Sequence, residues 1–237
     1  MCTVSYFKTK DSIIFTSNRD EKKSREKALF PNTLELEDRL LYFPKDKKAS
    51  GTWFAVDDKG NAAILLNGAF QKHTSNPPYK KSRGIVLLDI VKSKNILEAF
   101  QEYDMSEIEP FQLLVFSDEK LLRLLWDGNV KHEILLNENE NHLLSSKTLY
   151  NDSIENEREK DFRRFQINRN IESGEILNFH KKHQIEKEPE IDVSIKEEFL
   201  TVSITQLIIR KDKIHFAYHD LTENTIQHTK IERRSFV

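Results

Sequence analysis

The chain contains little cysteine, glycine, proline or tryptophan, and two of these shortages limit what it can be. Its 237 residues include one cysteine, six glycines, six prolines and two tryptophans. A single cysteine cannot form an internal disulfide, which fits a reducing, cytoplasmic compartment. The few glycines are widely spread and form no glycine-rich phosphate-binding loop. We therefore expect neither a disulfide framework nor a phosphate-loop site, and we predict no cofactor.

A large excess of one charge and long apolar runs are also missing. Lys and Arg total 37 against 39 Asp and Glu, so the chain lacks the basic footprint of a nucleic-acid-binding protein. No apolar stretch approaches the length of a membrane span, and Lys8 ends the first apolar run too early for a signal peptide. The mass of 28.0 kDa and the lack of a clear linker predict one domain over residues 1–237. We expect a small-molecule substrate or ligand as partner.

The position of the one cysteine is more informative than its number. Cys2 follows the initiator methionine, and its small size predicts removal of Met1, which would place a thiol and an α-amine on one residue. The amine, with an ordinary pKa of roughly 7.7–8.0, can act as general base toward a thiol of pKa about 8.5. Cys2 is therefore the candidate nucleophile. The ordinary alternative is a small buried apolar residue.

A polar tetrad, Asn18-Arg19-Asp20-Glu21, ends an apolar, β-branched run. An arginine stays charged and lowers the pKa of a nearby thiol, while an ionised aspartate can orient an α-amine. Strands over 2–8 and 12–17, joined by a turn, would return the chain to the level of Cys2 near residue 18. The alternative is a solvated charged turn that continues into residues 22–27.

These residues together resemble one family. The opening Met-Cys-Thr, the tetrad, Gly51-Thr52-Trp53 and Leu65-Leu66-Asn67 are similar to the NRDE family, also called the transport and Golgi organisation 2 proteins. The resemblance implies the fold of the N-terminal nucleophile hydrolases, an α+β four-layer αββα sandwich of two antiparallel sheets. Relatives of that fold include the cysteine-type conjugated bile salt hydrolases and penicillin V acylases. In these enzymes an N-terminal cysteine, a following arginine and aspartate, and later asparagines carry out amide chemistry.

The resemblance also assigns roles to later residues. It implies that Asn67 donates an amide N–H to a developing oxyanion. It places the candidate pocket residues Asn18, Glu21, Ser146 and Asn151 around the nucleophile. Ser146 stands where an asparagine is common in the family.

A second departure lies near the C-terminal end of the resemblance. Val202 occupies the place of an arginine in the stretch Thr201-Val202-Ser203-Ile204-Thr205.

The rest of the chain alternates between strand pairs and helical blocks. Apolar periodicity and turn residues predict antiparallel pairs over 52–57 with 61–66, 111–117 with 121–126, and 201–210 with 213–219. Helical spacing predicts blocks over 84–103 and 152–183, the second interrupted near Ser173-Gly174, with Arg158 among its solvent-facing residues.

Four histidines raise the question of a metal site. His180 and His183 are three residues apart on an expected helix, and His215 and His219 share a face of an expected strand. Their surroundings are expected to be charged and surface-like, without a cysteine or acidic partner at ligand spacing. We therefore predict no metal site.

Two functional hypotheses follow from these observations. The first is an N-terminal cysteine amidohydrolase or acyltransferase acting on a small amide or thioester, with Cys2, Arg19, Asp20 and Asn67 as catalytic residues. The second, favoured by Ser146 and Val202, is a catalytically silent module that binds or traffics a hydrophobic metabolite, lipid or haem-like.

Overall fold

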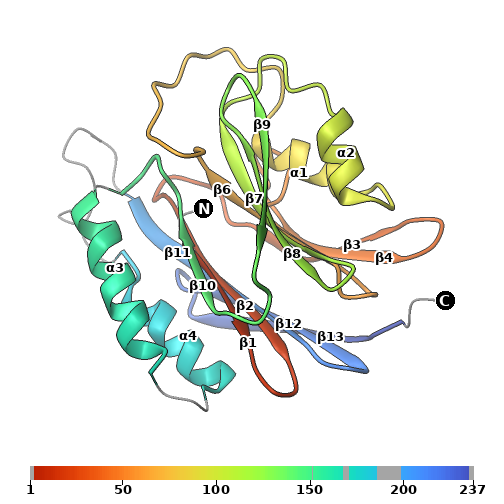
Figure 1. Ribbon diagram of the computed structural model, residues 1–237, viewed down its shortest axis with the longest axis vertical. Coiled ribbons are helices and arrows are strands. Elements are labelled where there is room, and N and C mark those ends of the chain that lie inside the picture. Colours follow the sequence, from red (N-terminus) through yellow and green to blue (C-terminus); the bar gives the residue numbers. More distant parts are fainter. Residues whose placement is uncertain (1–2, 151, 168–170, 186–198, 235–237) are drawn as a thin grey trace. The chain divides into compact units, whose positions relative to one another are not determined.

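The computed structural model describes residues 3–150, 152–167, 171–185 and 199–234. Its elements belong to two compact units (Figure 1). The first unit comprises residues 1–25 and 139–231, and the second comprises residues 26–138 and 232–237. Each unit contains one sheet and helices, and the α+β class with two antiparallel sheets is confirmed. The single domain over residues 1–237 stays a prediction.

The sheet of the first unit has six strands, in the order β10-β1-β2-β11-β12-β13. It combines strands from both ends of the sequence, because β2 pairs with β11. The strands are β1 (Thr3–Lys8), β2 (Ile13–Lys22), β10 (His142–Ser145), β11 (Phe199–Ile209), β12 (Lys213–Asp220) and β13 (Thr225–Glu232).

The predicted N-terminal hairpin is confirmed, with a register one residue from the predicted one, which set Cys2 at the level of residue 18. Thr3 on β1 faces Asn18 on β2, so the chain returns to the level of its own start at the tetrad. β2 continues to Lys22, beyond the predicted end at residue 17. The tetrad is therefore part of a central strand, and the alternative of a solvated turn is wrong for Arg19 and Asp20, which are buried.

Two helices of the first unit lie along one face of this sheet (Figure 1). They are α3 (Asp152–Phe165) and α4 (Ser173–Lys182). Phe7 and Ile14 from the hairpin pack with Phe162 from α3 and Ile176 from α4 in one apolar cluster. This burial attaches both helices to the sheet.

The break in the second helical block lies earlier than predicted. The backbone N–H of Glu172 donates to the carboxylate of Glu175 at 2.9 Å, an N-terminal capping contact. Ser173 and Gly174 therefore form the first turn of α4 and do not interrupt the block.

The sheet of the second unit has seven strands, consecutive in the sequence from β3 to β9. They are β3 (Leu29–Glu35), β4 (Leu40–Lys45), β5 (Phe54–Asp57), β6 (Ala62–Asn67), β7 (Phe111–Ser117), β8 (Lys120–Trp126) and β9 (Lys131–Leu136). The predicted pairs β5–β6 and β7–β8 are confirmed, as is β11–β12 in the first unit.

Five strands were not predicted: β3, β4, β9, β10 and β13. Four of these strands, β3, β9, β10 and β13, lie at the edges of the two sheets. These four edge strands bury few side chains completely. A strand with so little buried apolar surface has a weak apolar pattern, which explains why periodicity did not indicate it.

The predicted helical block over residues 84–103 is two helices, α1 (Arg83–Val91) and α2 (Ile96–Glu102). The Asn95 side chain accepts a hydrogen bond from the backbone N–H of Glu98 at 3.1 Å and caps the start of α2. None of the helices in the described ranges has the length and apolar character needed to cross a membrane.

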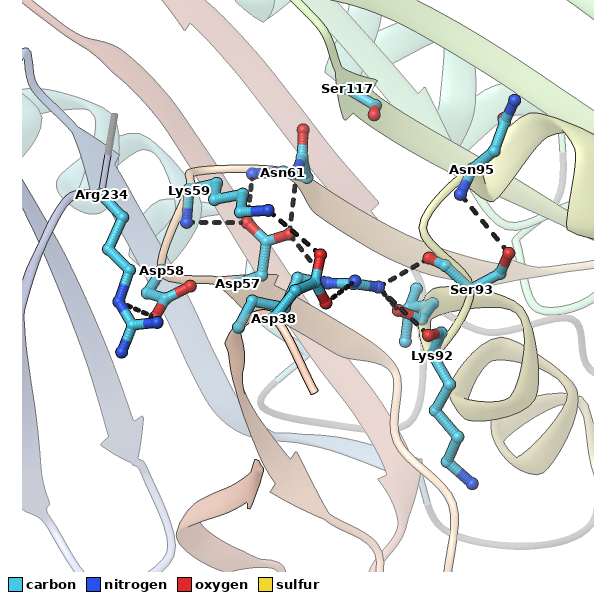
Figure 2. A network of polar contacts seen from close by, with 12 residues as sticks. Asp38, Asp57, Asp58, Lys59, Asn61, Lys92, Ser93, Asn95, Ser117 and Arg234 are labelled. Carbon is cyan, nitrogen blue, oxygen red and sulfur yellow. Dashed lines mark hydrogen bonds and ion pairs between the residues drawn. The ribbon is translucent and has the colours of Figure 1, made fainter. Parts of the chain in front are cut away.

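A polar network closes the C-terminal end of α1 (Figure 2). Buried Arg39 donates through Nη2 to the three consecutive carbonyls of residues 91–93, at 2.6–3.2 Å. Its Nε lies 3.3 Å from Oδ2 of Asp57. Burial raises the pKa of Asp57, and hydrogen bonds from Asn61 oppose that shift. The arginine thus satisfies helix-end carbonyls that would otherwise lack donors.

We expect Gly51→Ala to destabilise the second unit because two backbone segments touch there. A Cβ at Gly51 would lie 2.4 Å from the carbonyl carbon of Gly84, and backbone cannot move aside cheaply. The free energy of unfolding should fall by about 1–3 kcal/mol, measured by chemical denaturation. The matched control is Gly174→Ala, where a Cβ meets nothing within 4 Å. It should be neutral or slightly stabilising, and equal losses in both variants would contradict this packing argument.

Candidate functional site

The first described residue of the chain, Thr3, marks where the N-terminal strand begins. It is buried and pairs with Asn18 on β2 and with Ser145 on β10. Two of the predicted site residues, Cys2 and Asn151, lie outside the described residues. Thr3 is therefore the nearest described neighbour of the candidate nucleophile.

Asp20 is held by hydroxyl groups from two other segments of the chain. Its side chain is buried, at 3% exposure, and both of its oxygens accept hydroxyl hydrogen bonds. The Tyr150 hydroxyl donates to Oδ2 and the Thr201 hydroxyl donates to Oδ1. Thr201 Oγ1 in turn accepts the backbone N–H of Ile185 at 2.7 Å. Buried carboxylates need such donors, so these contacts fix the position of Asp20.

Strand alternation divides the tetrad between the two faces of the sheet. Asn18 and Asp20 point to the face covered by α3 and α4, where their described partners lie. Arg19 and Glu21 point to the opposite face, with Arg19 Nη2 3.8 Å from a Glu21 carboxylate oxygen. The tetrad can therefore place a carboxylate on one face of the sheet and a guanidinium on the other.

Asn18 belongs to a buried hydrogen-bond network with α4. His180 Nδ1 donates to Asn18 Oδ1 at 2.7 Å, and Asn18 Nδ2 donates to the His180 carbonyl at 3.1 Å. The Ser5 hydroxyl donates to His180 Nε2 at 2.7 Å. Burial lowers the pKa of His180 to about 3, and the positive charge of Arg158 adds to the shift. His180 is therefore a neutral structural histidine at pH 7.

The surface-like surroundings predicted for the histidines are wrong for His180, which is 1% exposed. Helix α4 lies against β2, and this contact buries the histidine. No group of three or more metal-ligating side chains with suitable geometry occurs among the residues that the structure describes.

Arg158 is the functional candidate that sequence reasoning missed. It was predicted to face solvent, but it is 4% exposed and lies on the sheet-facing side of α3. Nη1 donates to Thr3 Oγ1 and Nη2 donates to the His183 carbonyl, both at 2.8 Å. The guanidinium carbon lies 4.0 Å from the centre of the Tyr150 ring.

The sequence contained a signal for this placement. Arg158 is four residues after Ile154 and four before Phe162, both of which were expected to face inward, so all three share one helical face.

The structure also describes three other positions that the sequence analysis singled out, Ser146, Val202 and Asn67. Ser146 is buried after β10, and its hydroxyl lies 3.1 Å from the Thr148 hydroxyl. Val202 lies at a bulge of β11, between the residues that pair with Asp20 and Arg19. Asn67 ends β6 in the second unit, opposite Phe111. Its role as an oxyanion donor stays a prediction.

Solved structures of other proteins share the fold of this chain. A variant of the conjugated bile acid hydrolase from Clostridium perfringens, with alanine for its cysteine at position 2, matches with a TM-score of 0.58 at 10% identity, covering 100% of this chain and 99% of that one. An N-acylethanolamine-hydrolyzing acid amidase orthologue from Caenorhabditis elegans matches with a TM-score of 0.61 at 10% identity, covering 87% and 92%. The fold is that of the N-terminal nucleophile hydrolases, as predicted.

The family follows from the sequence itself. Residues 1–218 match the family described as transport and Golgi organisation 2, and the chain belongs to that family. No curated protein matches the chain.

We expect His180 to make the fold sensitive to acid. Because its pKa is lowered in the folded state, the unfolded chain takes up a proton that the folded chain does not, so stability is lost as pH falls below about 6.5. Between pH 7 and 5 the parent should lose about 2 kcal/mol more unfolding free energy than His180→Gln, measured by denaturation at both pH values. Identical pH dependence of the parent and His180→Gln would contradict the neutral, buried assignment.

Proposed function

We propose that this protein is an N-terminal cysteine hydrolase or acyltransferase acting on a small amide or thioester. The observation that carries the proposal is Asp20, a buried carboxylate held by two hydroxyls on the strand that pairs with the N-terminal strand. Membership of the family and the fold shared with a bile acid hydrolase and an acid amidase support the same conclusion. The sequence supplies the cysteine that this chemistry needs.

In the proposed first step, Cys2 attacks the substrate carbonyl through its sulfur. The α-amine of the same residue takes the thiol proton, and a carbon–sulfur bond forms as the carbonyl oxygen becomes an oxyanion. Collapse of this intermediate breaks the carbon–nitrogen bond of an amide, or the carbon–sulfur bond of a thioester substrate. The leaving group departs with the proton that the amine held, and the acyl group stays on Cys2 as a thioester.

The second step releases the acyl group. A water molecule gives one proton to the α-amine and attacks the acyl–enzyme carbonyl. The bond to Cys2 then breaks, the sulfur regains the proton, and a carboxylic acid leaves. An amine or alcohol in place of water would make the same site an acyltransferase.

The proposed roles of the other residues follow from their chemistry. Asp20 orients the α-amine as a fixed negative charge, and Arg19 favours the thiolate as a permanent positive charge. Asn67 is proposed as an oxyanion donor on its residue type and the family resemblance alone.

Two sequence departures favour a second candidate function, a module that binds a hydrophobic metabolite without turnover. Ser146 replaces an asparagine that is common in the family, and its hydroxyl is engaged with Thr148. Val202, an apolar residue, stands where the family has an arginine. Each change removes a polar group that amide chemistry could use.

A substrate panel separates the two functions. We expect untagged protein without Met1 to cleave members of a set of N-acyl amides and acyl thioesters of increasing chain length, measured by product release. Cys2→Ala should lower turnover at least about a thousandfold, because the nucleophile is removed. Turnover by Cys2→Ala at the parent rate would disprove the nucleophile assignment. If the parent cleaves nothing but binds a fluorescent fatty acid or haem saturably, and Cys2→Ala binds equally well, the binding module is the function.

A further inference from the structure

We propose that Arg158 is a positioning residue for the N-terminal nucleophile: its guanidinium holds Thr3 in place and supplies a buried positive charge one residue from Cys2. This inference rests on the proposed function, because it assigns Arg158 to the same site. Arg158 comes from α3, far in sequence from the tetrad, and nothing in the sequence resemblance assigns it a role.

The first support is the direction of its hydrogen bonds. Nη1 donates to the Thr3 side chain and Nη2 donates to the His183 carbonyl, both at 2.8 Å. These bonds use two different nitrogens, so the planar guanidinium is fixed in orientation and not only in position. One guanidinium nitrogen thus binds the residue that follows Cys2, and the other binds a carbonyl at the end of α4.

The second support is the link from Arg158 to Asp20. The guanidinium stacks on the Tyr150 ring at 4.0 Å, and the hydroxyl of that ring donates to Asp20. Tyr150 therefore lies between the cation and the carboxylate, contacting both. A guanidinium stacked on an aromatic face restrains the ring, so Arg158 helps to hold the group that fixes Asp20.

The third support is the depth of the charge. Arg158 is 4% exposed, and charges in such surroundings act over longer distances than surface charges do. Burial is the largest cause of the lowered pKa values of His180 and His183, and the charge of Arg158 is the next cause for both. Its field therefore reaches titratable groups around the start of β1.

The consequence for the nucleophile follows from the order of the residues. Thr3 directly follows Cys2 in the sequence, so the cation bound to the Thr3 hydroxyl is proposed to act on the N-terminal residue. A nearby positive charge disfavours the ammonium form of an α-amine and favours a thiolate. Both shifts increase the reactive fraction of the N-terminal residue. Arg158 thus acts from the helix-covered face, opposite to the face that Arg19 occupies.

Other charges surround the same guanidinium and set the size of its effect. Asp20 lies beyond Tyr150, and a crevice at α3 and α4 is lined by Glu157, Asp161 and Lys182 together with His183. These groups include both signs, so the net shift should be moderate.

The single cysteine gives a direct test through the rate of Cys2 alkylation by iodoacetamide against pH. Untagged parent protein without Met1 should show a midpoint below about 8.5. Arg158→Gln keeps hydrogen-bonding capacity but removes the charge, and it should raise the midpoint by about 1 pH unit. Arg158→Lys restores the charge and should return the midpoint most of the way to the parent value. The matched control Arg163→Gln removes an exposed arginine from the same helix and should change nothing.

Each outcome decides the inference. A lowered parent midpoint that Arg158→Gln leaves unchanged, with its circular dichroism also unchanged, overturns the role of Arg158 and leaves the proposed function standing. A parent midpoint at or above 8.5 contradicts the proposed function and this inference with it. If Arg158→Gln does not fold, Thr3→Val decides, because it removes the hydroxyl that the guanidinium holds. It should also raise the midpoint, and a parent-like value overturns the inference.

Discussion

The first unit is organised around one buried carboxylate. Burying an ionised group costs several kcal/mol unless hydrogen bonds replace its water, so Asp20 requires its donors. The two described donors come from different parts of the chain, Tyr150 ahead of α3 and Thr201 on β11. The carboxylate therefore joins the N-terminal hairpin to segments more than a hundred residues later. An apolar core alone would not specify where those segments meet.

The same face of the sheet carries further polar contacts beside those of Asp20. Asn18 and Ser5 hold His180 of α4, and Thr3 holds Arg158 of α3. Each helix thus contacts the hairpin both through an apolar cluster and through polar side chains. Apolar packing provides most of the attachment, and the polar contacts fix how each helix is rotated. The positions of charges around the start of β1 depend on that rotation.

How far the sequence predicts this structure depends on the kind of pattern involved. The hairpin follows from apolar runs around a turn, and its observed register, with Asn18 opposite Thr3, lies one residue from the expected one. The four predicted strand pairs share this strong signal. Edge strands such as β3 and β13 bury little apolar surface, so periodicity gives no indication of them. Asp20 is buried because β2 extends beyond its predicted end and includes it. Its hydroxyl donors could not be predicted, because long-range contacts leave no local pattern in the sequence.

For Arg158 the prediction from the sequence failed for a different reason. The helical spacing indicated an inward-facing residue, but the charge of the arginine side chain was given more weight. Its spacing from Ile154 and Phe162 places it on the inner face of α3, yet an arginine in a charge-rich helix is usually solvated. The structure buries it because the Thr3 hydroxyl, the His183 carbonyl and the Tyr150 ring together replace its water. A charged residue at an apolar position of a helix is therefore worth treating as a candidate site residue.

The most direct test of the account is the mass of the intact protein after brief exposure to an acyl thioester donor. The account predicts an added mass equal to one acyl group, located by peptide mapping at residue 2 of chains that lack Met1. The adduct should be absent from Cys2→Ala. Consumption of the donor at the same rate by both proteins, with no acyl group at residue 2, would contradict the claim that this fold presents an N-terminal cysteine nucleophile.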